Sequence, residues 1–266
     1  MQTKQKYTDY GQKGNKSNAI IFGGKERVPS VRFVADMKEV ILDQEWAKKN
    51  KSLPLYYMYR DLAESEKEAE KIKEADLRYD ILESVPVILG KEYNKTAGHY
   101  HSGIEDTNFT YPELYELIKG DAYYLMQKLK GDKIIDVYAV RAKSGDKVLM
   151  PPGYGHFTFF LSKDPIRMSN WTPSNSLSDY KQIKMKHGAA YYALVDKKAA
   201  DGIWWVKNGN YSEVPPLRFL KPTNFSDIGL VKDINMYGLA NNLEKLDYLN
   251  NPQNYSELWE RVLNNK

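Results

Sequence analysis

The 266-residue sequence predicts a mainly β protein, folded as an antiparallel sandwich or a small barrel. Short apolar runs of the kind found in strands follow one another through the middle of the chain: LRYDILESVPVIL, DAYYLMQKL, KIIDVYAVRA, DKVLM, HFTFFLS and PIRMSNW. The turn signals KGD, SGD, PPGYG and SKDP separate these runs. Hydrophobic residues make up 42% of the chain and aromatic residues 13%, which is enough for a sizeable core.

The segments before this β region predict an arm followed by short elements. We expect residues 1 to about 30 to form a loosely ordered arm with one apolar stretch, AIIFGG. A short helix is expected over residues 36–50, where Asp36 would be the N-cap and Glu39 lies three residues later. LPLYYMYRDL alternates as a strand does, and the charged stretch AESEKEAEKIKEAD indicates a solvated helix or a mobile loop.

The last third of the chain predicts a second β pair and a final helix. GAAYYALVD and GIWWVKNGNY would pair, and Ser256 would cap a helix whose apolar stripe is Leu258, Trp259 and Val262. We expect residues 1–180 to form the barrel with its arm, the core being about 31–173. Residues 181–266 would then be an extension packed on the barrel.

Composition excludes several classes of function. The net charge is +4, but 39 basic residues are interspersed with 35 acidic ones, which argues against a nucleic-acid partner and allows a small anionic substrate. Without cysteine, the chain has neither disulfides nor thiolate ligands. The polar N-terminus lacks a signal-peptide pattern, and no apolar run is long enough to span a bilayer, so we expect a cytoplasmic protein with no membrane partner.

Three of the four histidines lie beside glycines, in GHYHSG and PPGYGH. On a strand, His99 and His101 would point to the same face and could reach one cation about 2 Å from each. Glu113 and Tyr115 have the same spacing on a neighbouring strand, and His156 follows a rigid Pro-Pro-Gly turn. Three imidazoles and one carboxylate suit Fe, Ni, Zn or Mn better than Ca or Mg, so we expect one divalent transition metal per chain.

Each of these motifs also has a purely structural interpretation. A His-x-His pair is often two surface histidines, the proline turn could simply end in a satisfied histidine, and Glu113 could be a solvated carboxylate. Only the combination, in this order and in an all-β chain, favours a metal site. The fourth histidine, His187, is expected to be structural or peripheral.

The order G-H-x-H, E-x-Y, a Gly-Asp turn and P-P-x-x-x-H resembles the metal pattern of cupins, which are double-stranded β-helix (jelly-roll) barrels. More specifically, TAGHYH, ELY and PPGYGH resemble the motifs of the cupin-type (archaeal-type) glucose-6-phosphate isomerases. VRFVADMKEVILDQEWAKK is also similar to the N-terminal segment of that family. The resemblance covers roughly residues 31–173.

The resemblance implies an aldose-ketose isomerase that interconverts glucose 6-phosphate and fructose 6-phosphate in glycolysis and gluconeogenesis, usually as a homodimer. It implies four metal ligands: His99, His101, Glu113 and His156. Glu113 would also be the catalytic base of an enediol route, or remain only a ligand during a direct hydride shift.

The same resemblance assigns the substrate side of the site. Thr96 and the backbone of Gly98 would bind the phosphate, and Tyr115 would line the sugar site as a second catalytic residue. The positive charge beside the phosphate is expected from Lys95 or Lys91.

The chain departs from the family pattern on that side. Positions where the family has Asn, Tyr and His hold Phe160, Thr172 and Ser178, and a second phosphate-binding threonine has no match near Glu83 and Ser84. Two alternatives stay open for these reasons: a metal-dependent cupin dioxygenase with an apolar substrate, and a non-catalytic cupin that binds a sugar phosphate or serves as a storage or scaffold protein.

Overall fold

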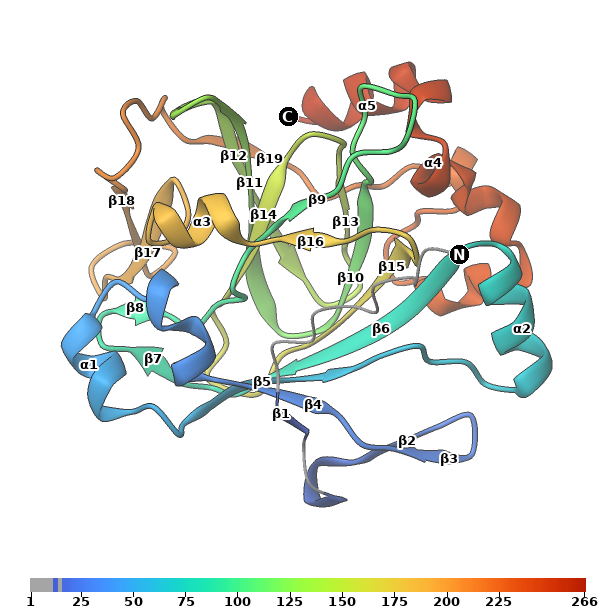
Figure 1. The fold of residues 1–266 in the computed structure, drawn as a ribbon, viewed down its shortest axis with the longest axis horizontal. Helices are drawn as coiled ribbons and strands as arrows, with labels where there is room; N and C mark the ends of the chain where they lie inside the picture. The colour runs from blue at the N-terminus through green and yellow to red at the C-terminus, as the bar shows by residue number, and fades with distance from the viewer. Residues whose placement is uncertain (1–11, 14–15) are drawn as a thin grey trace.

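The computed structural model describes residues 12–13 and 16–266, and two antiparallel sheets face each other in it (Figure 1). The larger sheet has the strand order β1 (Gln12–Lys13), β4 (Ser30–Phe33), β5 (Pro54–Tyr59), β6 (Leu77–Ser84), β15 (Arg167–Pro173), β10 (Glu113–Lys119) and β13 (Lys147–Met150). The smaller sheet has the order β14 (Gly155–Phe160), β11 (Asp121–Lys130), β12 (Lys133–Lys143) and β19 (Arg218–Leu220), of which only β19 is parallel to its neighbour. The predicted mainly β, jelly-roll architecture is confirmed.

Three smaller sheets complete the β structure of residues 12–13 and 16–266. One has the order β18 (Ile203–Lys207), β17 (Tyr191–Val195), β8 (Glu92–Tyr93) and β7 (Ile88–Leu89); the others are the pairs β16 (Ser178–Asp179) with β9 (Tyr100–His101) and β2 (Ile20–Phe22) with β3 (Lys25–Arg27). The predicted pairing of GAAYYALVD with GIWWVKNGNY is therefore confirmed as β17 and β18.

The single helix expected over residues 36–50 is wrong, because two short helices occupy that region. A 3-10 helix, η2 (Val34–Val40), ends at Ile41, whose backbone is extended (φ −87°, ψ 131°). Helix α1 (Gln44–Lys49) then starts at Asp43, whose carboxylate accepts the Trp46 N–H at 2.9 Å. Asp43 is therefore the N-cap of the α-helix.

The other helices lie at the surface of the β structure. The charged stretch after residue 64 is helix α2 (Glu66–Glu74), whose one buried residue is Ile72. Ser256 does not cap the last helix, because it is already the first residue of α5 (Ser256–Leu263). The remaining helices are α3 (Lys181–Met185), α4 (Asp247–Asn250) and the 3-10 helices η1 (Lys16–Asn18), η3 (Ser226–Ile228), η4 (Met236–Asn241), η5 (Leu243–Leu246) and η6 (Pro252–Asn254).

The expected N-terminal arm lies only partly within the described residues. Residues 1–11 and 14–15 are outside them. The apolar segment AIIFGG forms the first strand and turn of the β2–β3 hairpin, in which Ile20 pairs with Arg27.

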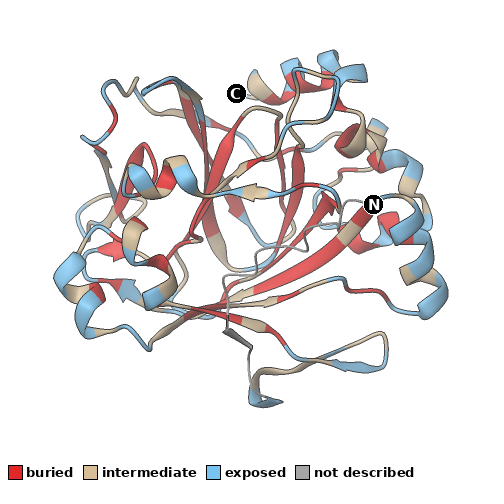
Figure 2. Cartoon of the chain, viewed as in Figure 1, coloured by how far each residue is buried: buried red, intermediate tan, exposed pale blue. Residues whose placement is uncertain are grey.

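Strand alternation sorts the side chains of the larger sheet onto two faces. On β6, Asp80 and Leu82 point toward the smaller sheet, whereas Tyr79 and Ile81 belong to the outer cluster. Between the two sheets, the ring of Tyr115 lies 5.2 Å from that of Tyr124. Figure 2 shows the resulting concentration of buried residues along both sheets.

The last third of the chain packs against both sheets. Residues 189–220 contribute Ala190, Tyr191 and Ile203 to the main core, and residues 230–262 cover the outer face of the larger sheet. In the contact between residues 230–262 and the larger sheet, Nε1 of Trp171 donates to the carbonyl of Met236 at 3.2 Å. The proposed division of the chain at residue 180 remains a prediction.

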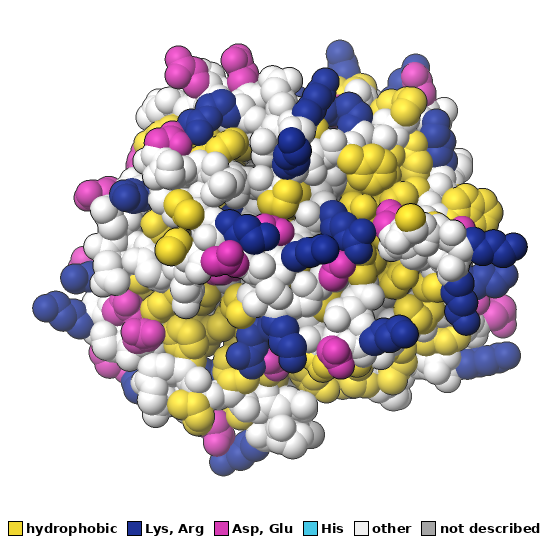
Figure 3. All heavy atoms as spheres, turned by 180° about the vertical axis from the view of Figure 1, so that it is seen from behind, with side chains coloured by type: hydrophobic (Ala, Val, Ile, Leu, Met, Phe, Trp, Pro, Cys, Tyr) yellow, Lys and Arg dark blue, Asp and Glu magenta, His cyan; other side chains and the backbone are white. Residues whose placement is uncertain are grey.

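Among the described residues, no helix is long and apolar enough to cross a membrane. On the face shown in Figure 3, Lys and Arg side chains are interspersed with Asp and Glu, and yellow hydrophobic side chains lie between them.

Trp171→Ala should lower the free energy of unfolding by about 3–5 kcal/mol, because the fully buried indole packs against Tyr79 and Tyr237. Urea denaturation measures this loss. Trp204→Ala is the matched control: that indole is 61% exposed, so its removal should change stability by no more than about 0.5 kcal/mol. Equal losses in the two variants would contradict the packing described here.

Candidate functional site

A pocket opens between the two sheets, and the inner face of the larger sheet forms its floor. Strand pairing arranges that floor in rows. Asp80, Asn170 and Tyr115 lie side by side on β6, β15 and β10, and the next row holds Met58, Leu82 and Met168. The segments 96–101 and 176–180 supply the other wall.

His99 and His156 face each other across a strand pair. The His156 N–H donates to the carbonyl of His99 at 3.1 Å, and the reverse hydrogen bond is 3.3 Å. Directly opposite residues place their side chains on the same face, and the two rings are 4.4 Å apart. His101 follows on β9, with its ring 4.9 Å from that of His99.

Glu113 completes the cluster from the first position of β10. Its Oε2 lies 3.2 Å from Nε2 of both His101 and His156, and 4.0 Å from Nε2 of His99. The Nε2 atoms of His99 and His101 are 3.0 Å apart, and one potential ligand atom from each of the four residues lies within 4.8 Å of all the others. The structure thus brings together all four predicted ligands.

Hydrogen bonding and burial act on the ionisable groups of this cluster. The Nδ1 of His101 lies 2.8 Å from the carbonyl of Tyr111 and donates to it. Burial lowers the pKa of His99 and of His156, which keeps both rings neutral. Burial raises the pKa of the Glu113 carboxyl, but the neighbouring His101 and His156 rings outweigh this effect and hold it well below its usual value.

This donor set fits a metal ion. Oε2 of Glu113 is buried and has no hydrogen-bond partner among the described residues. Two ligands at right angles around an ion about 2.1 Å away are about 3 Å apart, which matches the His99–His101 separation. Neutral imidazoles and an ionised carboxylate are also the forms that bind metal. A cation here would give the buried Oε2 of Glu113 the partner that it lacks among the described residues.

Tyr115 lies beside this cluster on β10. Its hydroxyl is 2.8 Å from Nε2 of His156. Burial, followed by the nearby Glu113 carboxylate, raises the pKa of Tyr115 well above its usual value. The phenol therefore stays protonated, and its proton can be donated to Nε2 of His156 or to a bound ligand.

Thr96 and Gly98 line the pocket next to His99. The Thr96 hydroxyl accepts the Thr158 N–H at 2.9 Å, so its own proton remains available to a ligand. Gly98 has a φ of +70°, and a Cβ at this position would overlap the ring of Phe157. Only glycine fits this turn without strain.

Lys95 does not supply the positive charge expected beside the phosphate, so that prediction is wrong. Its side chain is fully buried outside the pocket and pairs with Glu92, which is also fully buried. Burial lowers the pKa of Lys95 and raises that of Glu92, as expected for ions removed from water. The other candidate, Lys91, is exposed and does not line the pocket.

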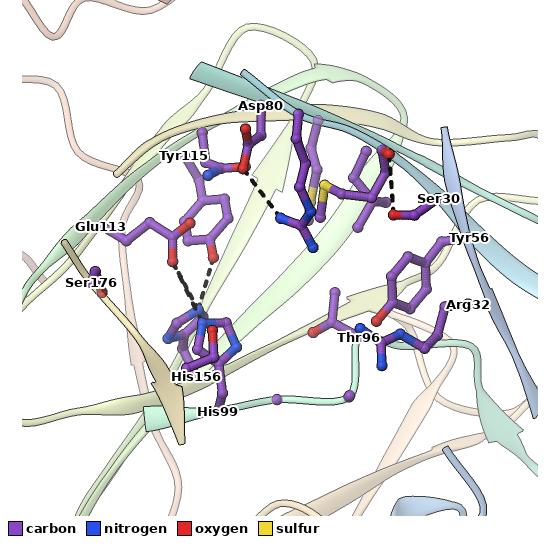
Figure 4. A pocket seen from close by; sticks show the side chains of 18 of the residues that line it. Ser30, Arg32, Tyr56, Asp80, Thr96, His99, Glu113, Tyr115, His156 and Ser176 are labelled. Atoms are coloured by element: carbon purple, nitrogen blue, oxygen red, sulfur yellow. Dashed lines mark hydrogen bonds and ion pairs between the residues drawn. The ribbon is translucent and has the colours of Figure 1, made fainter. Parts of the chain in front are cut away.

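The sequence analysis missed the arginines of this pocket. Arg32 is 7% exposed and lies opposite Tyr56 in the β4–β5 pair, with its guanidinium 5.9 Å from the tyrosine ring. Figure 4 shows Arg32, Tyr56 and Thr96 on one side of the pocket and the histidines with Glu113 on the other. No motif marks Arg32, because only the pairing of β4 with β5 brings it to the site.

Two further arginines, Arg60 and Arg78, meet at Asp80 on the pocket floor. Oδ2 of Asp80 lies 3.4 Å from Nη1 of Arg60 and 3.3 Å from Nε of Arg78, and Oδ1 accepts the Asp61 N–H at 3.0 Å. With Arg32, the pocket therefore holds three guanidinium groups.

Of the positions that depart from the family pattern, one lines the pocket and the others do not. Ser178 lines the pocket, opposite His101 in the β9–β16 pair. Phe160 and Thr172 are buried and do not line it. Glu83 pairs with Arg167, and Ser84 accepts the Ile166 N–H at 3.0 Å, so neither faces the pocket.

His187 is peripheral, as expected. It is exposed, and its Nδ1 lies 3.2 Å from the carbonyl of Glu39.

A jelly-roll barrel with three imidazoles and one carboxylate at a single interior point defines a cupin-type protein with a candidate metal centre. The chain belongs to the glucose-6-phosphate isomerase family, because the family model "Glucose-6-phosphate isomerase (GPI)" matches residues 31–211.

Curated relatives carry the same name. The glucose-6-phosphate isomerase of Thermococcus litoralis is 29% identical over 179 residues, which are 66% of this chain and 85% of the relative. The enzyme of Pyrococcus furiosus is 27% identical with the same coverage.

Solved structures match less closely. A recombinant oxalate oxidase in complex with glycolate has a TM-score of 0.29 and 16% identity over 38% of this chain and 43% of its own. The vicilin of Capsicum annuum has a TM-score of 0.32 and 12% identity over 47% of this chain and 30% of its own. This chain thus spans less than half of each, and these scores are too low to support any functional conclusion.

Lys95→Met should lower the free energy of unfolding by about 3 kcal/mol, because it leaves the buried Glu92 carboxylate without its partner. Urea denaturation at pH 7 measures the loss, and the double variant Glu92→Gln/Lys95→Met should recover part of it. A Lys95 that contacted substrate would instead raise KM with little loss of stability.

Proposed function

We propose that this chain is a metal-dependent glucose-6-phosphate isomerase, which interconverts glucose 6-phosphate and fructose 6-phosphate. The observation that carries the proposal is the layout of one pocket. A cluster that could hold a metal ion lies at one end, Arg32 with Thr96 lies at the other, and the chain belongs to a family of that name.

His99, His101, Glu113 and His156 would hold one divalent transition metal, of which Fe, Ni, Zn and Mn suit this donor set. When bound, such an ion polarises the oxygens on C1 and C2 of the sugar as a Lewis acid. The cluster lies in the barrel interior, where the low dielectric strengthens that effect.

Glu113 and Tyr115 would act on the reacting carbons from adjacent positions of one strand face. Because Glu113 is ionised at neutral pH, it can accept a proton that moves between C1 and C2. It would serve only as a ligand if the hydrogen moved as a hydride. The protonated Tyr115 hydroxyl would donate a hydrogen bond to a sugar oxygen.

Arg32, Thr96 and the Gly98 backbone would bind the phosphate at the opposite end. A dianionic phosphate needs charge-assisted hydrogen bonds from fixed donors, and Arg32 is held against Tyr56 by strand pairing. Arg32 thus replaces the second phosphate-binding threonine that the sequence lacks. Met58, Leu82 and Met168 form an apolar row on the floor between the two ends, suited to the carbon chain of the sugar.

The cationic end of the pocket favours this activity over the two alternatives. A dioxygenase acting on an apolar substrate would have no use for a buried arginine, and a pure binding protein would have no need of four convergent ligands. We also propose that the protein acts in glycolysis and gluconeogenesis as a cytoplasmic homodimer.

Removing metal should abolish isomerase activity, and a divalent transition metal should restore it. A coupled assay after chelation, with elemental analysis of the same samples, measures both. His99→Ala and His156→Ala should each lose metal occupancy, because imidazole nitrogens supply three of the four ligand atoms. Full activity in protein shown to be metal-free would rule out this proposal.

Arg32→Gln should raise KM for fructose 6-phosphate by about tenfold to a hundredfold, the range of a hydrogen bond to a charged group. Thr96→Val should raise it less, and Thr96→Ser, which keeps the hydroxyl, should change it little. Metal content should be unchanged in all three, and kcat should fall less than KM rises, since the phosphate is held alike in ground and transition states. Equal turnover of unphosphorylated fructose would disprove the phosphate assignment.

A further inference from the structure

The strand segment that carries two of the candidate ligands also carries a tyrosine on its other face. His99 and His101 line the pocket, whereas Tyr100 between them does not. Its side chain points through the wall of the barrel toward the outer side of the smaller sheet.

The ring of Tyr100 touches the neighbouring ligand-bearing strand. A Cβ on Gly155 would lie 2.6 Å from Cζ of that ring, so the ring packs directly on the Gly155 backbone. Gly155 immediately precedes His156. The ring of Tyr100 therefore connects the segment that carries His99 and His101 with the backbone next to His156.

Gln127 fixes the far end of this ring. It lies opposite Gly155 in the β11–β14 pair and is fully buried. Its Nε2 donates to the hydroxyl of Tyr100 at 3.1 Å and to that of Tyr211 at 3.0 Å, and its Oε1 accepts the Ala190 N–H at 2.7 Å. Both amide protons and the carbonyl of this side chain are thus used.

The other partners of Gln127 come from residues 188–211, which include β17 and β18 and are called the β17–β18 segment here. The Tyr211 hydroxyl donates in turn to the carbonyl of Gly188 at 2.9 Å. Trp205 of the same segment packs against Phe159 of β14, with ring centres 5.6 Å apart. The segment therefore covers the outer side of the wall whose inner side holds the ligands.

We infer that Gln127 is a positioning residue for the metal centre: through Tyr100 it ties the backbone of His99 and His101 to the β17–β18 segment. The inference rests on the proposed metal binding. A metal site tolerates errors of only about 0.2 Å in its ligand distances. A ring clamped between two ligand-bearing strands limits such errors, because any tilt of Tyr100 moves the backbone on both sides.

Three single hydroxyl deletions test this inference. Tyr100→Phe and Tyr211→Phe remove one end each of the Gln127 network and keep the rings. Tyr255→Phe is the matched control, since this half-buried tyrosine loses a comparable hydrogen bond, to the Asp247 carboxylate at 2.9 Å, and packs on the outer cluster of the larger sheet rather than in the β17–β18 segment. Three quantities are measured: the Zn²⁺ dissociation constant by chelator competition, the d–d absorption of the Co²⁺ form, and Tm of the metal-free protein.

Tyr100→Phe and Tyr211→Phe should each weaken Zn²⁺ binding by about tenfold, the lower end of the range for outer residues of metal sites. Both should alter the Co²⁺ spectrum, whereas Tyr255→Phe should lower only Tm. In the double variant Tyr100→Phe/Tyr211→Phe, the loss should be smaller than the product of the single losses, because both act through Gln127.

Two results would overturn the inference, and they are distinguishable. Zn²⁺ affinities within twofold of the wild type in both variants, with Tm lowered as in the control, would reduce the network to a purely structural role. A wild-type protein that binds neither Zn²⁺ nor Co²⁺ would overturn the proposed function together with the inference.

Discussion

The hydrogen-bonded pairing of His99 with His156 is the constraint on which the candidate site depends. It joins the segment that follows β8 to β14, the strand that begins after a Pro-Pro-Gly turn. The two imidazoles thereby lie on one face. Once this register is set, His101 is one pleat away. Glu113 reaches the same point from the facing sheet, because β10 begins there. A shift of the pairing by one residue would turn the imidazole of His156 out of the barrel.

Much of the fold follows from local sequence. The strands of the two main sheets that alternate clearly, with Gly and Pro between them, lie where the pattern predicts. The four candidate ligands also lie together as predicted, because the spacing of a motif in a strand determines which residues share a face. The N-terminal helices are different. Val40 and Ile41 are both buried, so the chain follows the core rather than its helical pattern, and Asp43 takes over the capping expected from Asp36.

The proposed substrate side of the pocket could not be predicted from local sequence. Arg32 and Tyr56 lie 24 residues apart and meet only because β4 pairs with β5. Lys95 precedes the motif residue Thr96, and this nearness led to the wrong expectation that its side chain enters the pocket. It faces Glu92 and the rings of Phe159 and Tyr192, and its ion pair with Glu92 offsets part of the cost of removing both charges from water. Nearness in sequence to a motif is therefore a poor guide to which cation enters a pocket, whereas sheet register is a good one.

The turn at Gly98 has a consequence for directed evolution of this barrel. Its backbone needs a positive φ, and its missing Cβ makes room for Phe157, so the two positions form a unit that a library should leave intact. Met58, Leu82 and Ser178 are different, since they project into the pocket from ordinary extended strands. Diversity introduced there would reshape the cavity for a different ligand while the scaffold that holds the histidines stays in place.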